Sequence, residues 1–217
     1  MDIILCGLFG YLIGNINPSY IIGRIKGFDI RENGSGNAGA SNAVLLMGKK
    51  VGAFSAVFDI FKAFFAVTLA FRLFPACAIA KEVAGLSCIL GHIFPVFMNF
   101  KGGKGLACIG GSVMAYNLKL FLILLTAEII LALITDYICV IPLTAAIAIP
   151  ILYALNCQSV LALILLCVTA AVVIYKHTEN VRRILEGKEA RISYLWNREK
   201  EVERLKGTWN QDVPEIK

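Results

Sequence analysis

Long apolar runs separated by short charged segments are the feature that most constrains this chain. The runs lie near residues 3–23, 51–74, 79–99, 105–117, 118–135, 138–156 and 157–175. A helix that crosses a bilayer needs about 20 predominantly apolar residues, and the run 105–117 is shorter than that. Hydrophobic residues make up 58% of the 217 positions, too many for one water-soluble core. We therefore predict an all-α polytopic membrane protein with about seven transmembrane helices. Any count from five to seven fits the apolar runs equally well.

The basic residues predict the orientation of these helices. With seven spans, 17 of the 21 Lys and Arg residues fall on one side of the membrane, against Arg72, Lys81 and Lys119 on the other, while Lys62 lies within a span. Because basic loops are retained in the cytoplasm, the N-terminus is expected outside and the C-terminus in the cytoplasm. Three polar stretches, residues 31–50, 91–105 and 176–189, then share the cytoplasmic side and could form one site.

Composition also argues against several classes of function. The net charge of +6 comes from basic residues between and after the apolar runs, as membrane topology requires, so we expect no nucleic-acid partner. The cysteines lack C-x-x-C spacing, and with two histidines and no clustered carboxylates we expect no bound metal and no cofactor. The seven cysteines are interpreted as small apolar residues: Cys6, Cys77, Cys88, Cys108, Cys139, Cys157 and Cys167.

The first polar stretch contains the segment 34-GSGNAGASN-42, which matches G-x-G-x-x-G. That pattern indicates a dinucleotide site only between a strand and a helix, whereas here an apolar run precedes it. Flexible backbone and short polar side chains are instead suited to binding phosphate oxygens, although a flexible linker is the alternative. The candidate phosphate-binding residues are Gly34, Ser35, Gly36, Asn37, Gly39, Ser41 and Asn42.

The second polar stretch, 91-GHIFPVFMNFKGGKG-105, places glycines beside two lysines. Glycine allows backbone N–H groups to converge on an anion, and lysine supplies charge. The segment is not a Walker A motif, and a turn whose lysines reach the lipid head groups is the alternative. The candidate residues here are His92, Lys101, Gly102, Gly103 and Lys104.

The third polar stretch, 176-KHTENVRRILEGKE-189, follows the last apolar run directly. If the helix continues, His177 and Asn180 share one face, and Arg182 and Arg183 add positive charge. His177 could act as a general base or bind phosphate. A helix end held at anionic lipid by its basic residues is the alternative.

Ionisable residues also occur inside the apolar runs. Asp59 and Lys62 lie three residues apart, so we expect a buried ion pair, a structural one more readily than a proton relay. The sequence offers no partner for Glu128. Such charges, together with the short run 105–117, also suit a transporter of a phosphorylated small molecule.

The chain changes to mixed charge after Tyr175, which divides it into a transmembrane domain, residues 1–176, and a cytoplasmic tail, residues 177–217. Within 189–207, apolar residues recur at near-helical spacing, which predicts an amphipathic helix on the inner leaflet or a solvated helix. We assign no chemistry to that part of the tail.

Together, the three polar stretches resemble the signature motifs of the bacterial acyl-phosphate:glycerol-3-phosphate acyltransferases, the PlsY family. The matches are residues 35–42, residues 91–97 with 101–105, and His177 with Glu179 and Asn180. The resemblance implies an integral enzyme of the bacterial inner membrane whose active site faces the cytoplasm. It would transfer a fatty acyl group from acyl phosphate to the sn-1 hydroxyl of glycerol 3-phosphate, giving lysophosphatidic acid and phosphate.

The resemblance also assigns roles to residues. Ser35, Lys104 and His177 are the expected catalytic residues. The remaining candidates are expected to bind substrate: Gly34, Gly36, Asn37, Gly39, Ser41, Asn42, His92, Lys101, Gly102, Gly103 and Asn180. Stabilising the leaving phosphate and positioning the hydroxyl would supply much of the rate. The expected partners are acyl phosphate, glycerol 3-phosphate and membrane lipid, and the sequence does not indicate whether a protein partner exists.

The sequence departs from the family pattern at two functional positions. Leu45 stands where the family usually has arginine, and the patch 137–142 lacks the usual serine, whereas Ser41 keeps the hydroxyl of the usual threonine. A lipid-binding paralogue of low activity is therefore a further alternative.

Overall fold

The computed structural model describes residues 1–155 and 159–207. Within these ranges every regular element is helical, as the sequence predicts. Cys157, the junction of the expected spans 138–156 and 157–175, and the tail positions after 207 lie outside the described residues.

Most of the α-helices follow the apolar runs, whereas one lies in the first polar stretch and one in the charged tail. They are α1 Asp2–Gly14, α2 Pro18–Ile25, α3 Ala40–Met47, α4 Lys49–Leu73, α5 Ala80–Ile93, α6 Leu106–Tyr116, α7 Leu118–Thr135, α8 Val140–Ala154, α9 Val160–Leu185 and α10 Arg198–Leu205. Short 3-10 helices are η1 Ile30–Glu32, η2 Val96–Met98 and η3 Ile192–Leu195. Four segments of the described chain are long and apolar enough to cross a membrane: Lys49–Leu73, Ala80–Met98, Leu118–Thr135 and Val160–Leu185. Helices α6 and α8 are apolar but shorter.

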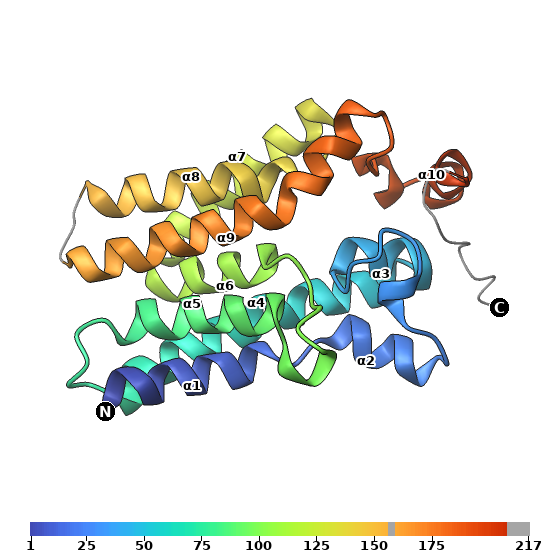
Figure 1. The fold of residues 1–217 in the computed structure, drawn as a ribbon. Helices are drawn as coiled ribbons and strands as arrows, with labels where there is room; N and C mark the ends of the chain where they lie inside the picture. The colour runs from blue at the N-terminus through green and yellow to red at the C-terminus, as the bar shows by residue number, and fades with distance from the viewer. Residues whose placement is uncertain (156–158, 208–217) are drawn as a thin grey trace.

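The long helices run roughly alongside one another (Figure 1). Helices α1, α4 and α5 pack together on one side, α7, α8 and α9 on the other, and α6 contacts both α4 and α7. The α1–α5 contact is close because glycine lines it. A Cβ added at Gly14 would lie 2.2 Å from the carbonyl oxygen of Cys88, so only glycine allows the backbones to approach this closely. The number of membrane crossings and the orientation remain predictions.

The expected single span over residues 3–23 is wrong, because the chain leaves the helix between Gly14 and Pro18. Proline lacks an N–H group and disfavours helical geometry in the residue before it. Asn17 takes an extended conformation there and caps α2, its side chain accepting a bond of 2.9 Å from the Tyr20 N–H. The break leaves backbone carbonyl groups inside the bundle without helical partners.

The last long helix and the tail also differ from a simple apolar run. Helix α9 continues through the third polar stretch to Leu185, which places His177 and Asn180 on one face as predicted. The tail is not one continuous helix over 189–207, because it turns at Trp196 and Asn197 between η3 and α10. The Asn197 side chain accepts the N–H of Lys200 and so caps the start of a new helix. Tyr194 is buried against Val44 and Leu45 of α3.

Candidate active site

A cavity of about 410 Å³ lies at the end of the bundle where α3, the start of α6, the end of α9 and the tail meet. All three polar stretches contribute to its wall. The predicted site residues that line it are Ser35, Asn37, Gly39, Ser41, Asn42, His92, Lys104, His177 and Asn180. The expectation that distant polar segments converge is therefore confirmed, although the role of each residue remains a prediction.

Asn42 holds the first polar stretch in shape. Its side-chain N–H groups donate to the carbonyl oxygens of Ile30, Asn33 and Asn37 at 3.0 to 3.1 Å, and its Oδ1 accepts the Ser35 N–H at 3.0 Å. It is almost completely buried. Since both ends of the amide are engaged within the loop, Asn42 positions Ser35 and has little capacity left for a ligand.

The loop leads into α3, whose N-terminus faces the cavity. Gly39 is the N-cap residue and offers no side-chain acceptor. Its carbonyl accepts the first helical bond, from the Ala43 N–H. The first N–H groups of a helix have no partner within it, and the helix dipole makes this end positive. Together with the Ser35 hydroxyl, this end of α3 is suited to an anion.

Lys104 supplies a buried positive charge. Its side chain is 13% exposed, donates to Asn180 Oδ1, and lies 3.8 Å from a carboxylate oxygen of Glu179. Burial, followed by the neighbouring Arg183 charge, lowers the Lys104 pKa to about 8. A cation that is poorly hydrated and only partly neutralised favours binding of a substrate anion.

His177 is buried on the face of α9 that lines the cavity. Its Nδ1 lies 2.8 Å from the Val173 carbonyl oxygen, one turn earlier in the helix. Because a carbonyl only accepts, Nδ1 carries the proton, and Nε2 of the neutral ring is then an acceptor. This arrangement suits hydrogen bonding to a hydroxyl group.

Asp59, Lys62 and His92 form a buried network at the inner end of the cavity. Lys62 Nζ lies 2.7 Å from Asp59 Oδ1 and 3.0 Å from His92 Nδ1. The same ammonium donates to the carbonyl oxygens of Gly14 and Ile16, at 3.0 and 2.5 Å. These are the carbonyl groups freed by the break before α2. The predicted ion pair is confirmed, and the network joins three parts of the bundle.

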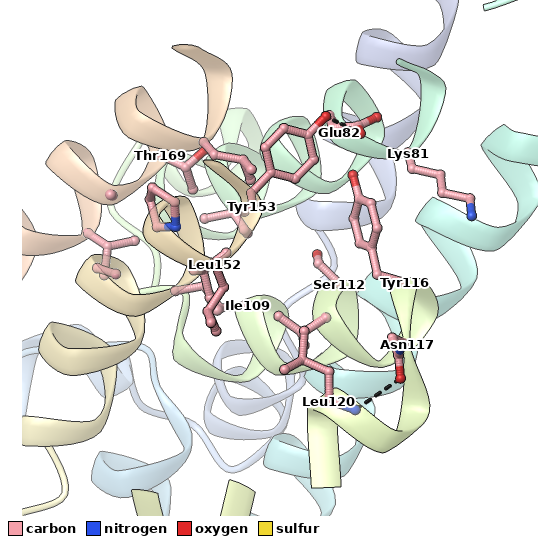
Figure 2. A pocket seen from close by; sticks show the side chains of 18 of the residues that line it. Lys81, Glu82, Ile109, Ser112, Tyr116, Asn117, Leu120, Leu152, Tyr153 and Thr169 are labelled. Atoms are coloured by element: carbon pink, nitrogen blue, oxygen red, sulfur yellow. Dashed lines mark hydrogen bonds between the residues drawn. The ribbon is translucent and has the colours of Figure 1, made fainter. Parts of the chain in front are cut away.

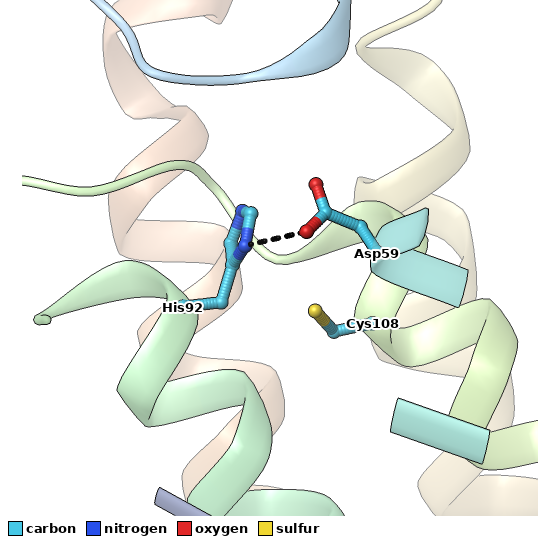
Figure 3. A group of neighbouring side chains, drawn as sticks. All are labelled: Asp59, His92 and Cys108. Atoms are coloured by element: carbon cyan, nitrogen blue, oxygen red, sulfur yellow. Dashed lines mark ion pairs between the residues drawn. The ribbon is translucent and has the colours of Figure 1, made fainter. Parts of the chain in front are cut away.

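Asp59, His92 and Cys108 have potential metal-ligand atoms within 4.8 Å of one another (Figure 3). The ammonium of Lys62 already contacts the Asp59 and His92 atoms that would bind the metal. A second cation beside it would be repelled. The geometry therefore favours an ion-pair network over a metal site.

Five predicted substrate-binding residues do not line the cavity: Gly34, Gly36, Lys101, Gly102 and Gly103. Lys101 is exposed. The Gly102 and Gly103 N–H groups donate at 3.0 Å to Ile93 and His92 carbonyl oxygens, so the prediction that these amides bind phosphate conflicts with the structure. A Cβ on Gly103 would lie 2.0 Å from His92 Nε2, which shows that this glycine serves close packing. Gly34 and Gly36 have positive φ and shape the loop.

The sequence did not indicate that the inner part of the tail contributes to the site. Glu189 is buried and accepts bonds of 2.7 Å from Asn180 and from Arg183. Arg183 lines the cavity with its side chain 13% exposed, whereas the Arg182 side chain is 81% exposed. Tyr194 also reaches the wall. Helical spacing alone could have separated the two arginines, but nothing in the sequence indicated that the tail folds back.

Leu45, the departure from the family pattern, is 2% exposed and packs beside Tyr194. The backbone there is tied to the tail, because Arg198 Nε donates to the carbonyl oxygens of Val44 and Leu45 at 3.1 and 2.8 Å. Arg198 does not line the cavity. The position thus anchors the tail and supplies no charge to the site.

Comparison with known proteins agrees with this geometry. A family model described as glycerol-3-phosphate acyltransferase matches residues 4–187. Glycerol-3-phosphate acyltransferases from Bacillus velezensis and Aquifex aeolicus are both 35% identical to this chain, over 90% and 85% of it and over 100% and 96% of their own lengths.

Two crystal structures of PlsY, an integral membrane glycerol 3-phosphate acyltransferase, are similar in fold. Its glycerol 3-phosphate form has a TM-score of 0.81 at 33% identity, covering 90% of this chain and 98% of that one. Its lysophosphatidic acid form has a TM-score of 0.77, covering 88% and 95%. Sequence and fold agree over nearly the whole of each protein, and the chain belongs to the glycerol-3-phosphate acyltransferase family.

Proposed function

We propose that this glycerol-3-phosphate acyltransferase takes its acyl group from acyl phosphate and carries out the transfer in the cavity lined by Ser35, Lys104 and His177. The observation that carries the proposal is the convergence of the three polar stretches on that one cavity. Its buried lysine and helix N-terminus suit phosphate groups, which both substrates contain. The product, lysophosphatidic acid, would enter phospholipid synthesis.

The phosphate groups are expected to bind at Lys104 and at the N-terminus of α3. Lys104 has a single side-chain acceptor within hydrogen-bond distance in the described chain, Asn180, which leaves it able to donate to substrate oxygens. The Ser35 hydroxyl and the first N–H groups of α3 would add neutral donors. These donors would stabilise charge on the departing phosphate, which is the electrostatic part of catalysis.

The transfer itself exchanges one bond to oxygen for another. The sn-1 hydroxyl oxygen bonds to the acyl carbon, the bond from that carbon to the phosphate oxygen breaks, and inorganic phosphate leaves. The hydroxyl proton passes either to His177 Nε2 or to a substrate phosphate oxygen. In the second case His177 only orients the hydroxyl. Since acyl phosphate already has a good leaving group, positioning would supply much of the rate.

The orientation is part of the proposal. A bacterial inner membrane with the cavity on the cytoplasmic side is supported by the basic residues at that end, which include Lys49, Lys104 and Arg183 in the wall. Water-soluble glycerol 3-phosphate would enter from the cytoplasm, and the acyl chain from the lipid.

A turnover assay tests the proposal. Purified protein given acyl phosphate and glycerol 3-phosphate should release phosphate in equal amount to lysophosphatidate. The change Lys104→Ala should lower kcat/KM about a hundredfold or more, the usual effect of removing a transition-state donor. Lys26→Ala, an exposed lysine outside the cavity wall, is the control. Absence of turnover with intact binding of acyl phosphate would instead support a non-catalytic lipid-binding protein.

A further inference from the structure

A second cavity, of about 580 Å³, lies toward the opposite end of the bundle. Figure 2 shows side chains that line it. Helices α5, α6, α8 and α9 line both cavities. In the second cavity, each of these helices contributes residues that lie farther along the helix from the candidate site. On α5 this second cavity extends from Lys81 to Ile89, which lie eight positions apart and so about 12 Å along the helix. We call it the distal cavity.

The inner end of the distal cavity is closed by packed core. Val173 is 0% exposed, Ile89 5% and Ile109 6%. His177 and His92 stand one turn beyond Val173 and Ile89 and face the candidate active site. Since the side chains between the two cavities are packed, the distal cavity is separate from the candidate active site.

The wall of the distal cavity is effectively apolar. Its leucine, isoleucine and alanine side chains come mainly from α6, α8 and α9. The hydroxyl groups of Ser112 and Thr169 donate to the carbonyl oxygens of Cys108 and Leu165, at 2.9 and 2.8 Å, so their hydrogens are already bound. Such a wall favours a hydrocarbon chain, and the volume lies in the usual range for ligand pockets.

The outer end of the distal cavity carries both signs of charge. Among the described residues, no carboxylate lies within 4.0 Å of the Lys81 ammonium, which lies 4.2 Å from the centre of the Phe71 ring and 5.7 Å from that of Tyr116. The neighbouring Glu82 accepts a long bond of 3.4 Å from the Tyr153 hydroxyl. The Tyr116 hydroxyl is buried on the side of Glu82 and makes no hydrogen bond within 3.5 Å in the described chain. A lysine without a carboxylate partner in that part of the chain and a carboxylate beside two tyrosines therefore lie at the outer end.

We propose that the distal cavity binds one acyl chain of a membrane phospholipid whose head group contains both a phosphate and a primary ammonium. The chain would fill the apolar cavity, the phosphate would contact Lys81, and the ammonium would contact Glu82. A purely anionic head group would be repelled by Glu82, and a purely cationic one would be repelled by Lys81. Charge complementarity therefore selects a head group that carries both charges. The site is independent of the transfer reaction and lies toward the other leaflet.

Photolabelling in vesicles tests the proposal. The full-length protein is reconstituted with a trace of phosphatidylethanolamine that carries a photoreactive group at the end of one chain. We expect labelled peptides from α6, α8 and α9. Lys81→Gln should reduce this labelling about tenfold, as expected for loss of a charged hydrogen bond to phosphate. Glu82→Gln should reduce it for the ethanolamine probe but not for a matched phosphatidylglycerol probe.

Two further variants control the experiment. Lys119→Gln removes an exposed lysine of the same end that does not line the cavity, and it should leave labelling unchanged. Ala170→Phe should fill the cavity and abolish labelling, with acyltransferase activity as the measure of correct folding. Unchanged labelling in Lys81→Gln would overturn the proposal. Displacement of the probe by excess acyl phosphate would also overturn it, because the donor's own chain would then be the occupant.

Discussion

The ionisation of Lys104 links the candidate site to pH. Burial lowers its pKa from the ordinary 10.5 to about 8, so the lysine loses its charge at a pH where an exposed lysine would keep it. A lowered pKa means that the folded protein disfavours the protonated form. The protonated lysine therefore reduces folding stability below pH 8, and the reduction disappears as pH rises toward 10.5. Phosphate binding, in contrast, would favour the protonated form of Lys104.

We predict that kcat/KM falls as pH rises through about 8, because the free enzyme then loses the cation that binds phosphate. A pH profile of initial rates at low substrate concentration measures this. In Lys104→Arg the side chain stays charged, so any activity that the variant retains should not show the fall near pH 8. A wild-type profile that is flat between pH 7 and 9 would contradict the assignment.

Arg182 and Arg183 are adjacent but point in different directions, which makes them a matched pair. Arg183→Ala should lower kcat/KM about tenfold or more, because Glu189 loses a charged partner and Asn180 its fixed position. Arg182→Ala should change kcat/KM less than about twofold, since Arg182 pairs with exposed Glu186 at the surface. Equal effects in the two variants would show that general positive charge, and not position, is what matters.

At the scale of elements, the break between α1 and α2 is stabilised by Lys62. A helix interrupted inside a membrane leaves carbonyl groups that need donors, since lipid offers none. The Lys62 ammonium donates hydrogen bonds to the carbonyl oxygens of Gly14 and Ile16, and Asp59 balances its charge. One side chain of α4 thus fixes the direction in which α2 leaves the bundle and approaches the first polar loop.

Lys62→Met should destabilise the protein by about 3 to 5 kcal/mol, because it leaves a buried carboxylate without its partner. Unfolding in detergent, followed by circular dichroism, measures the change. The double variant Asp59→Leu with Lys62→Met should recover part of the loss, since no isolated charge then remains. Equal stability of the single variant and the wild type would refute a structural role for the pair.

At the scale of the whole molecule, the tail completes the wall of the candidate site. Residues from η3 and the segment before it, including Glu189 and Tyr194, line the cavity together with residues from α3 and α9. Arg198 donates to the Val44 and Leu45 carbonyl oxygens in the last turn of α3, where helix carbonyl groups lack partners within the helix, although Val44 also accepts the Gly48 N–H. The division at residue 176 predicted from the sequence therefore separates segments that share one cavity, and the division itself stays a prediction.

Arg198→Ala should loosen the tail and lower activity several-fold, because a charged hydrogen bond to a helix end contributes about 1.5 to 3 kcal/mol. Limited proteolysis should show faster cleavage near residues 186–197, where the tail joins α9. Lys200→Ala removes an exposed charge of the same helix and should leave both the cleavage and the activity as in the wild type. Unchanged proteolysis in Arg198→Ala would mean that the packing of Tyr194 alone holds the tail.

The sequence by itself determined the helical class, the family and the three polar stretches of the candidate site, because apolar run length and local residue types carry that information. It also predicted the Asp59–Lys62 pair, which depends only on helical spacing. The tertiary structure alone decided that Gly103 packs against His92, that Arg183 and not Arg182 faces the cavity, and that Glu189 returns to Asn180. These outcomes depend on which distant segments meet, and that is fixed by packing of the whole bundle and not by any local pattern.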